Sequence, residues 1–134
     1  MELNTSQIGQ IVEQKCIVFF LEKGYTVSIP VGNYAKYDLL LEKNNKFYRI
    51  QCKHANIIET GFKLKTCIQA RNGLRRGYTI EDCDYFMTEA NGKFYLFPVW
   101  NQIEKKIWTV PPKNNLNSCV LAKNFLAEEI LKQL

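Results

Sequence analysis

Three polar side chains in the first half of the chain can together carry out metal-assisted hydrolysis of a phosphodiester bond. They are Asp38, Gln51 and Lys53. A carboxylate and an amide oxygen can bind Mg²⁺ against a phosphate, and an ammonium group can offset developing charge or position the attacking water. Asp38 also stands in an otherwise apolar run, where an isolated charge needs a partner or a metal. These residues are therefore the candidate catalytic set.

Two predicted strands and one turn are enough to bring these side chains together. Residues 37–41 are apolar apart from Asp38, and residues 47–53 alternate in polarity, so both runs predict β-strands. Side chains alternate across a strand, so Gln51 and Lys53 share one face. We expect an antiparallel pair that places Asp38 beside them.

The pattern of Asp38, twelve intervening residues and then Gln51-Cys52-Lys53 resembles the core motif of the PD-(D/E)XK nuclease superfamily. It is most similar to the branch of group I intron homing endonucleases, in which Gln commonly replaces the acidic residue. The resemblance covers residues 7–100. Gly32 takes the place of the superfamily's usual proline near the aspartate, at a position that varies in such families.

The resemblance implies a role for each of these residues. Asp38 and Gln51 would bind Mg²⁺, for which Mn²⁺ can substitute, and the backbone carbonyl of Cys52 would complete the coordination. Lys53 would stabilise the pentacovalent phosphate or position water. Glu13 lies at the edge of the apolar stripe of a predicted helix and matches the superfamily's helix carboxylate, which binds metal or orients the lysine. The neutral amide of Gln51 predicts weaker metal binding than a glutamate would give.

The remaining sequence predicts a helix at each end of a β-rich chain. Residues 6–23 have apolar side chains at helical spacing, and residues 25–30 predict a short strand. Asn91-Gly92 predicts a hairpin turn between two apolar runs, since both residues tolerate positive φ. A last helix, capped by Ser118, should run through Leu131. With the resemblance, this order predicts an α/β or α+β fold of the restriction-endonuclease type, a central mixed sheet flanked by the first and last helices.

A basic, otherwise irregular tract follows the candidate catalytic residues. Residues 56–80 carry five Lys or Arg side chains against one acid, Glu59. Charge of this sign and density neutralises phosphates and releases counterions, while Arg and Gln can also read base edges. Residues 62–67 alternate as a strand would, with Lys63 and Lys65 on one face. We expect contacts with double-stranded DNA from Lys63, Lys65, Gln69, Arg71, Arg75, Arg76 and Tyr78.

Composition restricts the class of protein. The chain has 134 residues, 46% of them hydrophobic and 23% charged, which predicts one globular domain spanning residues 1–134. Its apolar runs are too short for a membrane span or a signal peptide, so we expect a cytoplasmic protein. The five cysteines form no CxxC pair, which argues against a disulfide framework and a structural zinc site. The net charge of +5 suits a polyanionic partner.

These features favour a Mg²⁺-dependent endonuclease that cuts a specific site in double-stranded DNA, as the resemblance to homing endonucleases implies. A chain this small reads a long site, and cuts both strands, only as an oligomer, so we expect a homodimer or homotetramer. We expect no membrane partner and no nucleotide cofactor. Two alternatives stay open: a Holliday-junction resolvase, and a DNA-binding protein of the same fold that has lost cleavage, for which Gln51 is the only hint. RNA as a substrate also stays open.

Overall fold

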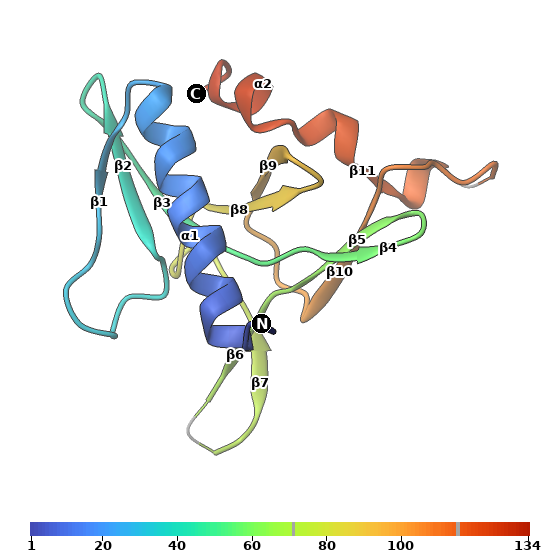
Figure 1. Cartoon of the computed structure of the whole chain (residues 1–134), viewed down its shortest axis with the longest axis horizontal. Helices are drawn as coiled ribbons and strands as arrows, with labels where there is room; N and C mark the ends of the chain where they lie inside the picture. The colour runs from blue at the N-terminus through green and yellow to red at the C-terminus, as the bar shows by residue number, and fades with distance from the viewer. Residues whose placement is uncertain (71, 115) are drawn as a thin grey trace.

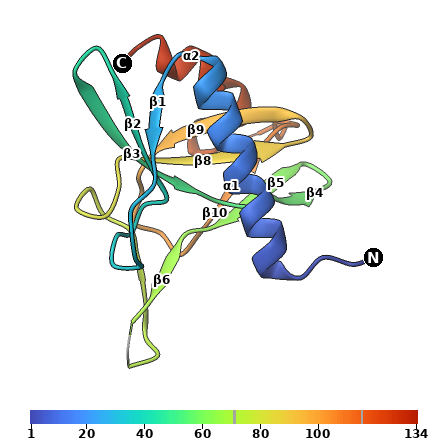
Figure 2. The same cartoon turned by 60° about the vertical axis from the view of Figure 1, so that its left-hand side comes forward.

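A computed structural model describes residues 1–70, 72–114 and 116–134 (Figures 1 and 2). In this part of the chain the larger sheet has five strands in the order β1-β2-β3-β8-β9. β3 and β8 run parallel and the other neighbours antiparallel, so the sheet is mixed, as predicted. Its strands are β1 (Thr26–Ser28), β2 (Leu39–Lys43), β3 (Lys46–Cys52), β8 (Tyr85–Ala90) and β9 (Lys93–Pro98).

The N-terminal helix α1 (Thr5–Glu22) lies across one face of this sheet (Figure 1). Asn4 caps it, because the Asn4 side chain accepts a hydrogen bond from the Gln7 backbone N–H and the Gln7 side chain accepts one from the Asn4 N–H. The helix buries Val12, Cys16 and Phe20 against Leu39, Leu41, Ile50, Met87 and Leu96 of the sheet. This packing fixes the rotation of the helix and therefore the position of Glu13 next to the buried stripe.

Two tight turns set the register of the sheet. Asn44 and Asn45 join β2 to β3 with φ of 54° and 62°, a left-handed conformation that asparagine tolerates. The resulting hairpin pairs Leu39 with Ile50. Asn91 and Gly92 join β8 to β9 in the same way, with φ of 53° and 82°. Both hairpins agree with the sequence prediction.

The basic tract forms strands along most of its described length. The strand predicted over residues 62–67 is confirmed as β5, whereas the rest of the tract, predicted to be irregular, forms β4, β6 and β7. A second sheet has the order β11-β10-β5-β4, and β6 pairs with β7 in a separate hairpin. The core between the two sheets contains Phe62 and Ile107 of the second sheet and Phe86 and Phe97 of the first, all fully buried. The strands are β4 (Asn56–Ile58), β5 (Gly61–Lys65), β6 (Cys67–Gln69), β7 (Arg75–Gly77), β10 (Glu104–Trp108) and β11 (Val120–Leu121).

The closing helix is much shorter than predicted. Leu116–Ser118 and Ala122–Phe125 are 3₁₀ turns on either side of β11, and only Ala127–Leu131 (α2) is α-helical. Ser118 therefore does not cap this helix, whose N-cap is Leu126. The reason is that Val120 pairs with Ile107 of β10, so the segment is held as a strand before the helix can start.

The predicted fold class is confirmed in its main features. The mixed sheet is flanked by α1 and α2, and Ala127 of α2 joins the core that α1 covers. Within the described residues, no helix has both the length and the apolar character needed to cross a membrane.

Candidate active site

Asp38 is held by two backbone contacts at the start of β2. Its N–H donates to the Ile50 carbonyl at 2.8 Å, and its Oδ2 accepts the Cys52 N–H at 2.9 Å. Both partners belong to β3, so the β2–β3 hairpin fixes the carboxylate directly beside the strand that carries Gln51. The structure confirms the prediction that Asp38 lies beside residues 51–53.

Lys53 follows the last residue of β3. Its backbone N–H donates to the Met87 carbonyl of β8 at 2.8 Å, which fixes the main chain. Its Nζ donates to the Tyr78 hydroxyl at 2.9 Å and lies 4.8 Å from the centroid of the same ring. Tyr78 is only 5% exposed and packs edge to face against Phe86, so the structure places it under the lysine rather than on the outer surface.

The charges of Asp38 and Lys53 act on one another. Burial raises the pKa of Asp38, and the Cys52 N–H and the Lys53 charge partly offset that rise. Burial lowers the pKa of Lys53, and the negative charge of Asp38 partly offsets that fall. Each group therefore favours the ionised form of the other, which is the form that phosphodiester hydrolysis needs.

Glu13 reaches the same region from α1. It is half-buried, and its pKa is raised by burial and then by the charge of Asp38. The negative charge of Asp38 therefore acts on Glu13, and carboxylate oxygens of this kind suit Mg²⁺. The described residues contain no group of three or more His, Cys, Asp or Glu side chains placed to share a metal ion. The Gln51 amide remains the predicted third side-chain ligand.

Gln51 and Cys52 lie on opposite faces of β3, as predicted. Gln51 is half-buried and pairs with Phe86 of β8. The Cys52 thiol points toward α1, where a hydrogen bond with Cys16, followed by burial, raises its pKa. The Cys52 side chain is therefore part of the core, and its main chain is part of the site through the hydrogen bond to Asp38.

Comparison with known proteins identifies the family. Residues 3–125 match the sequence profile of the PD-(D/E)XK endonucleases. The chain belongs to the PD-(D/E)XK endonuclease family. No curated protein sequence gives a significant match.

Solved structures support the same fold for this PD-(D/E)XK chain. The bacterial homing endonuclease I-Ssp6803I is 19% identical and aligns with a TM-score of 0.76 over 97% of this chain and 93% of its own. At this identity the likeness shows the fold. The structure of MepB, 13% identical, aligns with a TM-score of only 0.38 over 76% of this chain and 83% of its own. Family and fold together support a DNA endonuclease.

Apart from Tyr78, which is buried next to Lys53 and so is not placed to contact DNA as predicted, the predicted DNA-contacting residues that the structure describes fall on two elements. Lys63 and Lys65 are on β5, and Gln69 and Arg75 are exposed on the β6–β7 hairpin. Arg76 is on the same hairpin but makes two hydrogen bonds to the Asp82 carboxylate, at 2.8 and 3.0 Å. Arg71 lies outside the described residues.

Lys106 is a basic residue beside the predicted ones that the sequence did not predict. Lys106 on β10 lies directly opposite Lys63 on β5, and its Nζ is 3.3 Å from the centroid of the Trp108 ring. Like charges directly opposite each other destabilise a sheet, and the Glu104 carboxylate, whose Oε1 lies 4.0 Å from Lys63 Nζ, partly offsets that repulsion. The sequence did not predict a strand at Lys106, because residues 104–108 begin with three charged residues and show no clear alternation.

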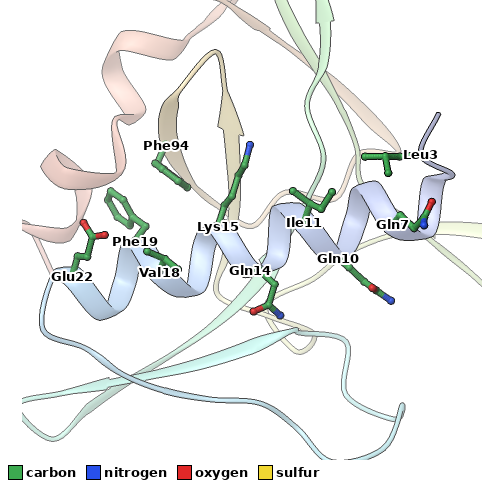
Figure 3. Close-up of a pocket in the computed structure, with 10 residues that line it drawn as sticks. All are labelled: Leu3, Gln7, Gln10, Ile11, Gln14, Lys15, Val18, Phe19, Glu22 and Phe94. Carbon is green, nitrogen blue, oxygen red and sulfur yellow. The ribbon is translucent and has the colours of Figure 1, made fainter. Parts of the chain in front are cut away.

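A separate groove of about 670 Å³ lies along the outer face of α1 (Figure 3). Leu3, Ile11 and Val18 line it on the helix side, and Phe94 closes it from β9. Glu13, Asp38, Gln51 and Lys53 are not among its lining residues. The groove and the candidate active site are therefore distinct features of the described structure.

Proposed function

We propose that this chain is a Mg²⁺-dependent, site-specific endonuclease that hydrolyses phosphodiester bonds in double-stranded DNA. The observation that carries the proposal is the direct link between Asp38 and the strand end that holds Lys53. The Asp38 carboxylate accepts the Cys52 N–H, and the next residue, Lys53, places its ammonium in the field of the same carboxylate. One hairpin thus presents an oxygen ligand and a positive charge to one phosphate.

Asp38, Gln51 and Glu13 are the side chains that would hold Mg²⁺, with Mn²⁺ as a substitute and the Cys52 carbonyl as a further ligand. A divalent ion there supplies Lewis-acid stabilisation of the phosphate and lowers the pKa of an attacking water. Lys53 offsets the charge that develops on the phosphate oxygens or orients the water. Tyr78 holds the lysine in place through its hydroxyl and its ring.

The basic residues of β5 and of the β6–β7 hairpin are the proposed DNA contacts. Phosphates fix the register of the duplex, and long side chains such as Arg75 and Gln69 read base edges. The proposal of site specificity draws on the structural likeness to a homing endonuclease. Cleavage of both strands requires two active sites, so the protein should act as a homodimer or homotetramer.

Nicking of supercoiled plasmid in Mg²⁺ tests the proposed chemistry. Asp38→Asn keeps an oxygen that can accept the Cys52 N–H, and Lys53→Met keeps most of the side-chain volume, so both variants should fold. We expect each to cut at least ~10²-fold more slowly and to bind DNA nearly as well as the wild type. Lys46→Met, which removes an exposed lysine beside the β2–β3 turn, serves as the control and should cut normally.

Two results would contradict this assignment. A folded Asp38→Asn variant with full activity would remove Asp38 from the site. A wild-type protein that binds duplex DNA but does not nick it in either Mg²⁺ or Mn²⁺ would favour a DNA-binding protein that has lost cleavage.

Substrate competition separates site-specific cleavage from junction resolution. The purified protein is offered a randomised linear duplex library and a four-way junction at matched salt concentration. We expect selective cutting of a small set of linear sequences. Faster cutting of junctions of unrelated sequence would identify a resolvase instead.

A further inference from the structure

The loop between β1 and β2 exposes large apolar side chains to solvent. Val31 is 100% exposed, Tyr34 is 91% exposed and Ile29 is 57% exposed. Gly32 has a φ of +84°, which a glycine adopts without strain, and this turn separates Val31 from Tyr34. Apolar side chains gathered at one place on a surface usually mark a contact with another molecule.

This loop is attached directly to the candidate active site. It begins where β1 ends, at Ser28, and runs to Asp38, whose N–H is fixed by the Ile50 carbonyl. Tyr34 is four residues from Asp38, so the two Cα atoms are at most about 14 Å apart. Figures 1 and 2 both show the β1–β2 loop projecting from the same end of the molecule as the β6–β7 hairpin.

The charges around the loop suit a polyanion. Residues 29–37 contain one lysine, Lys36, and no acidic residue. The neighbouring hairpin adds Arg75 and an exposed apolar residue, Leu74, at 66% exposure. A surface that combines positive charge with exposed aromatic and aliphatic side chains matches DNA, which has anionic phosphates, sugar carbon atoms and base faces on which an aromatic ring can stack.

We propose that residues 29–36 form a second DNA-binding element, in which the Tyr34 ring packs against a base beside the scissile phosphate and Val31 packs against the adjacent sugar. This inference rests on the proposed function, because it assumes that duplex DNA lies across the site. The contact is apolar, so it adds affinity and local opening of the base stack without neutralising a phosphate. The β6–β7 hairpin supplies the ionic part of the contact from the same end of the molecule.

Salt-dependent binding distinguishes an apolar contact from an ionic one. The probe is a labelled random-sequence duplex, titrated with protein in Ca²⁺ in place of Mg²⁺ at several salt concentrations. Tyr34→Ala should weaken binding about tenfold and leave the slope of log K against log[salt] unchanged. Arg75→Ala should reduce that slope by about one. Tyr34→Phe, which keeps the ring, should bind like the wild type.

The matched control is Phe47→Ala, because Phe47 is an exposed aromatic residue, 57% exposed, near the β2–β3 turn at the far end of the hairpin from Asp38. It should bind like the wild type. Plasmid nicking in Mg²⁺ and light scattering are measured on the same preparations. Slower nicking by Tyr34→Ala at an unchanged native mass supports the inference.

Three results would overturn it. If the wild type binds and cuts DNA and Tyr34→Ala does so equally well, the loop inference fails while the proposed function stands. If Tyr34→Ala lowers the native mass, the loop is a protein interface and not a DNA contact. If the wild type neither binds nor nicks duplex DNA, the proposed function fails and the inference fails with it.

Discussion

Lys53 is a half-buried lysine, and among the described residues Asp38 is the carboxylate that acts on its charge. Burial disfavours its charged form, whereas the Asp38 charge and the Tyr78 hydroxyl favour it. Burial also raises the pKa of Tyr78, so the tyrosine stays a neutral hydroxyl and accepts a hydrogen bond from the lysine. The ionisation of Lys53 therefore depends on neighbours that can be removed one at a time.

Replacing Tyr78 with Phe should make cleavage more sensitive to alkaline pH. The change keeps the ring but removes the hydroxyl that stabilises the ammonium, so the pKa of Lys53 falls further below its ordinary value. Cleavage requires the charged form, which means that activity is lost at a lower pH than in the wild type. Rates of plasmid nicking across alkaline pH measure this, and we expect a loss of about tenfold on the alkaline limb.

The control for this experiment is Tyr95→Phe, another buried tyrosine of the same core cluster. It should leave the pH profile unchanged. An unchanged profile for Tyr78→Phe as well would show that the Tyr78 hydroxyl does not influence the lysine during cleavage.

Gln51→Glu should strengthen metal binding and lower the stability of the metal-free protein. A third carboxylate near Asp38 and Glu13 adds repulsion in the absence of a cation and a charged ligand in its presence. We expect half-maximal cleavage at a Mg²⁺ concentration about tenfold lower, and a larger rise of Tm on adding Mg²⁺ than in the wild type. Gln51→Ala should need more Mg²⁺. The exposed Gln133→Glu is the control, and identical titrations for all the proteins would exclude Gln51 as a ligand.

At the scale of elements, the base of the β6–β7 hairpin is tied to the loop that precedes β8. The Asp82 carboxylate accepts hydrogen bonds from the Arg76 guanidinium and from the Thr79 N–H at 2.9 Å. These bonds, those from Arg76 first, lower the pKa of Asp82. Gly77, at the end of the hairpin, packs so closely that an added Cβ would lie 2.7 Å from the Asn101 carbonyl carbon.

Asp82→Asn should therefore destabilise the protein in a pH-dependent way. A carboxylate whose pKa is lower in the folded state than in the unfolded state stabilises the fold above about pH 4, and this stabilisation is lost as the pH falls through the folded value. We expect the variant to lose about 1 kcal/mol of unfolding free energy near pH 7 and much less near pH 3. Urea unfolding at the two pH values measures the difference. An equal loss at both would attribute the effect to packing rather than charge.

The parts of the fold that the sequence predicted are those in which local pattern and tertiary structure agree. The β2–β3 hairpin has an apolar first strand, an alternating second strand and a turn, Asn44-Asn45, that accepts positive φ, so the position of Asp38 beside residues 51–53 followed from sequence alone. β10 could not be predicted in the same way, because its charged residues adopt a strand through pairing with β5 and β11, which are distant in sequence. The contact between Tyr78 and Lys53 joins positions 25 residues apart and leaves no local pattern.

At the scale of the whole molecule, the two sheets share a core, and the proposed active site occurs once per chain, at the β2–β3 hairpin. One chain therefore offers one set of Asp38, Gln51 and Lys53, whereas cutting a duplex requires a set for each strand. We expect light scattering to give a native mass of two or four times the 15.7 kDa of one chain. A protein that is monomeric while it cuts both strands would contradict this expectation.

The order of the strands also keeps the proposed DNA-contacting hairpin apart from the strands that carry the proposed catalytic residues. This separation is useful for protein engineering. β3 and β8 are neighbours in the sheet but are joined by a long excursion that contains the β6–β7 hairpin. The two ends of that hairpin, Cys67 and Gly77, are register partners and so only about 5 Å apart. A hairpin with adjacent ends can be exchanged for another without moving the strands that carry Asp38 and Lys53, provided that the Arg76 bonds to Asp82 and the close packing of Gly77 are kept. If the hairpin contacts DNA as proposed, this chain is a scaffold whose target preference can be changed by grafting a single contiguous segment.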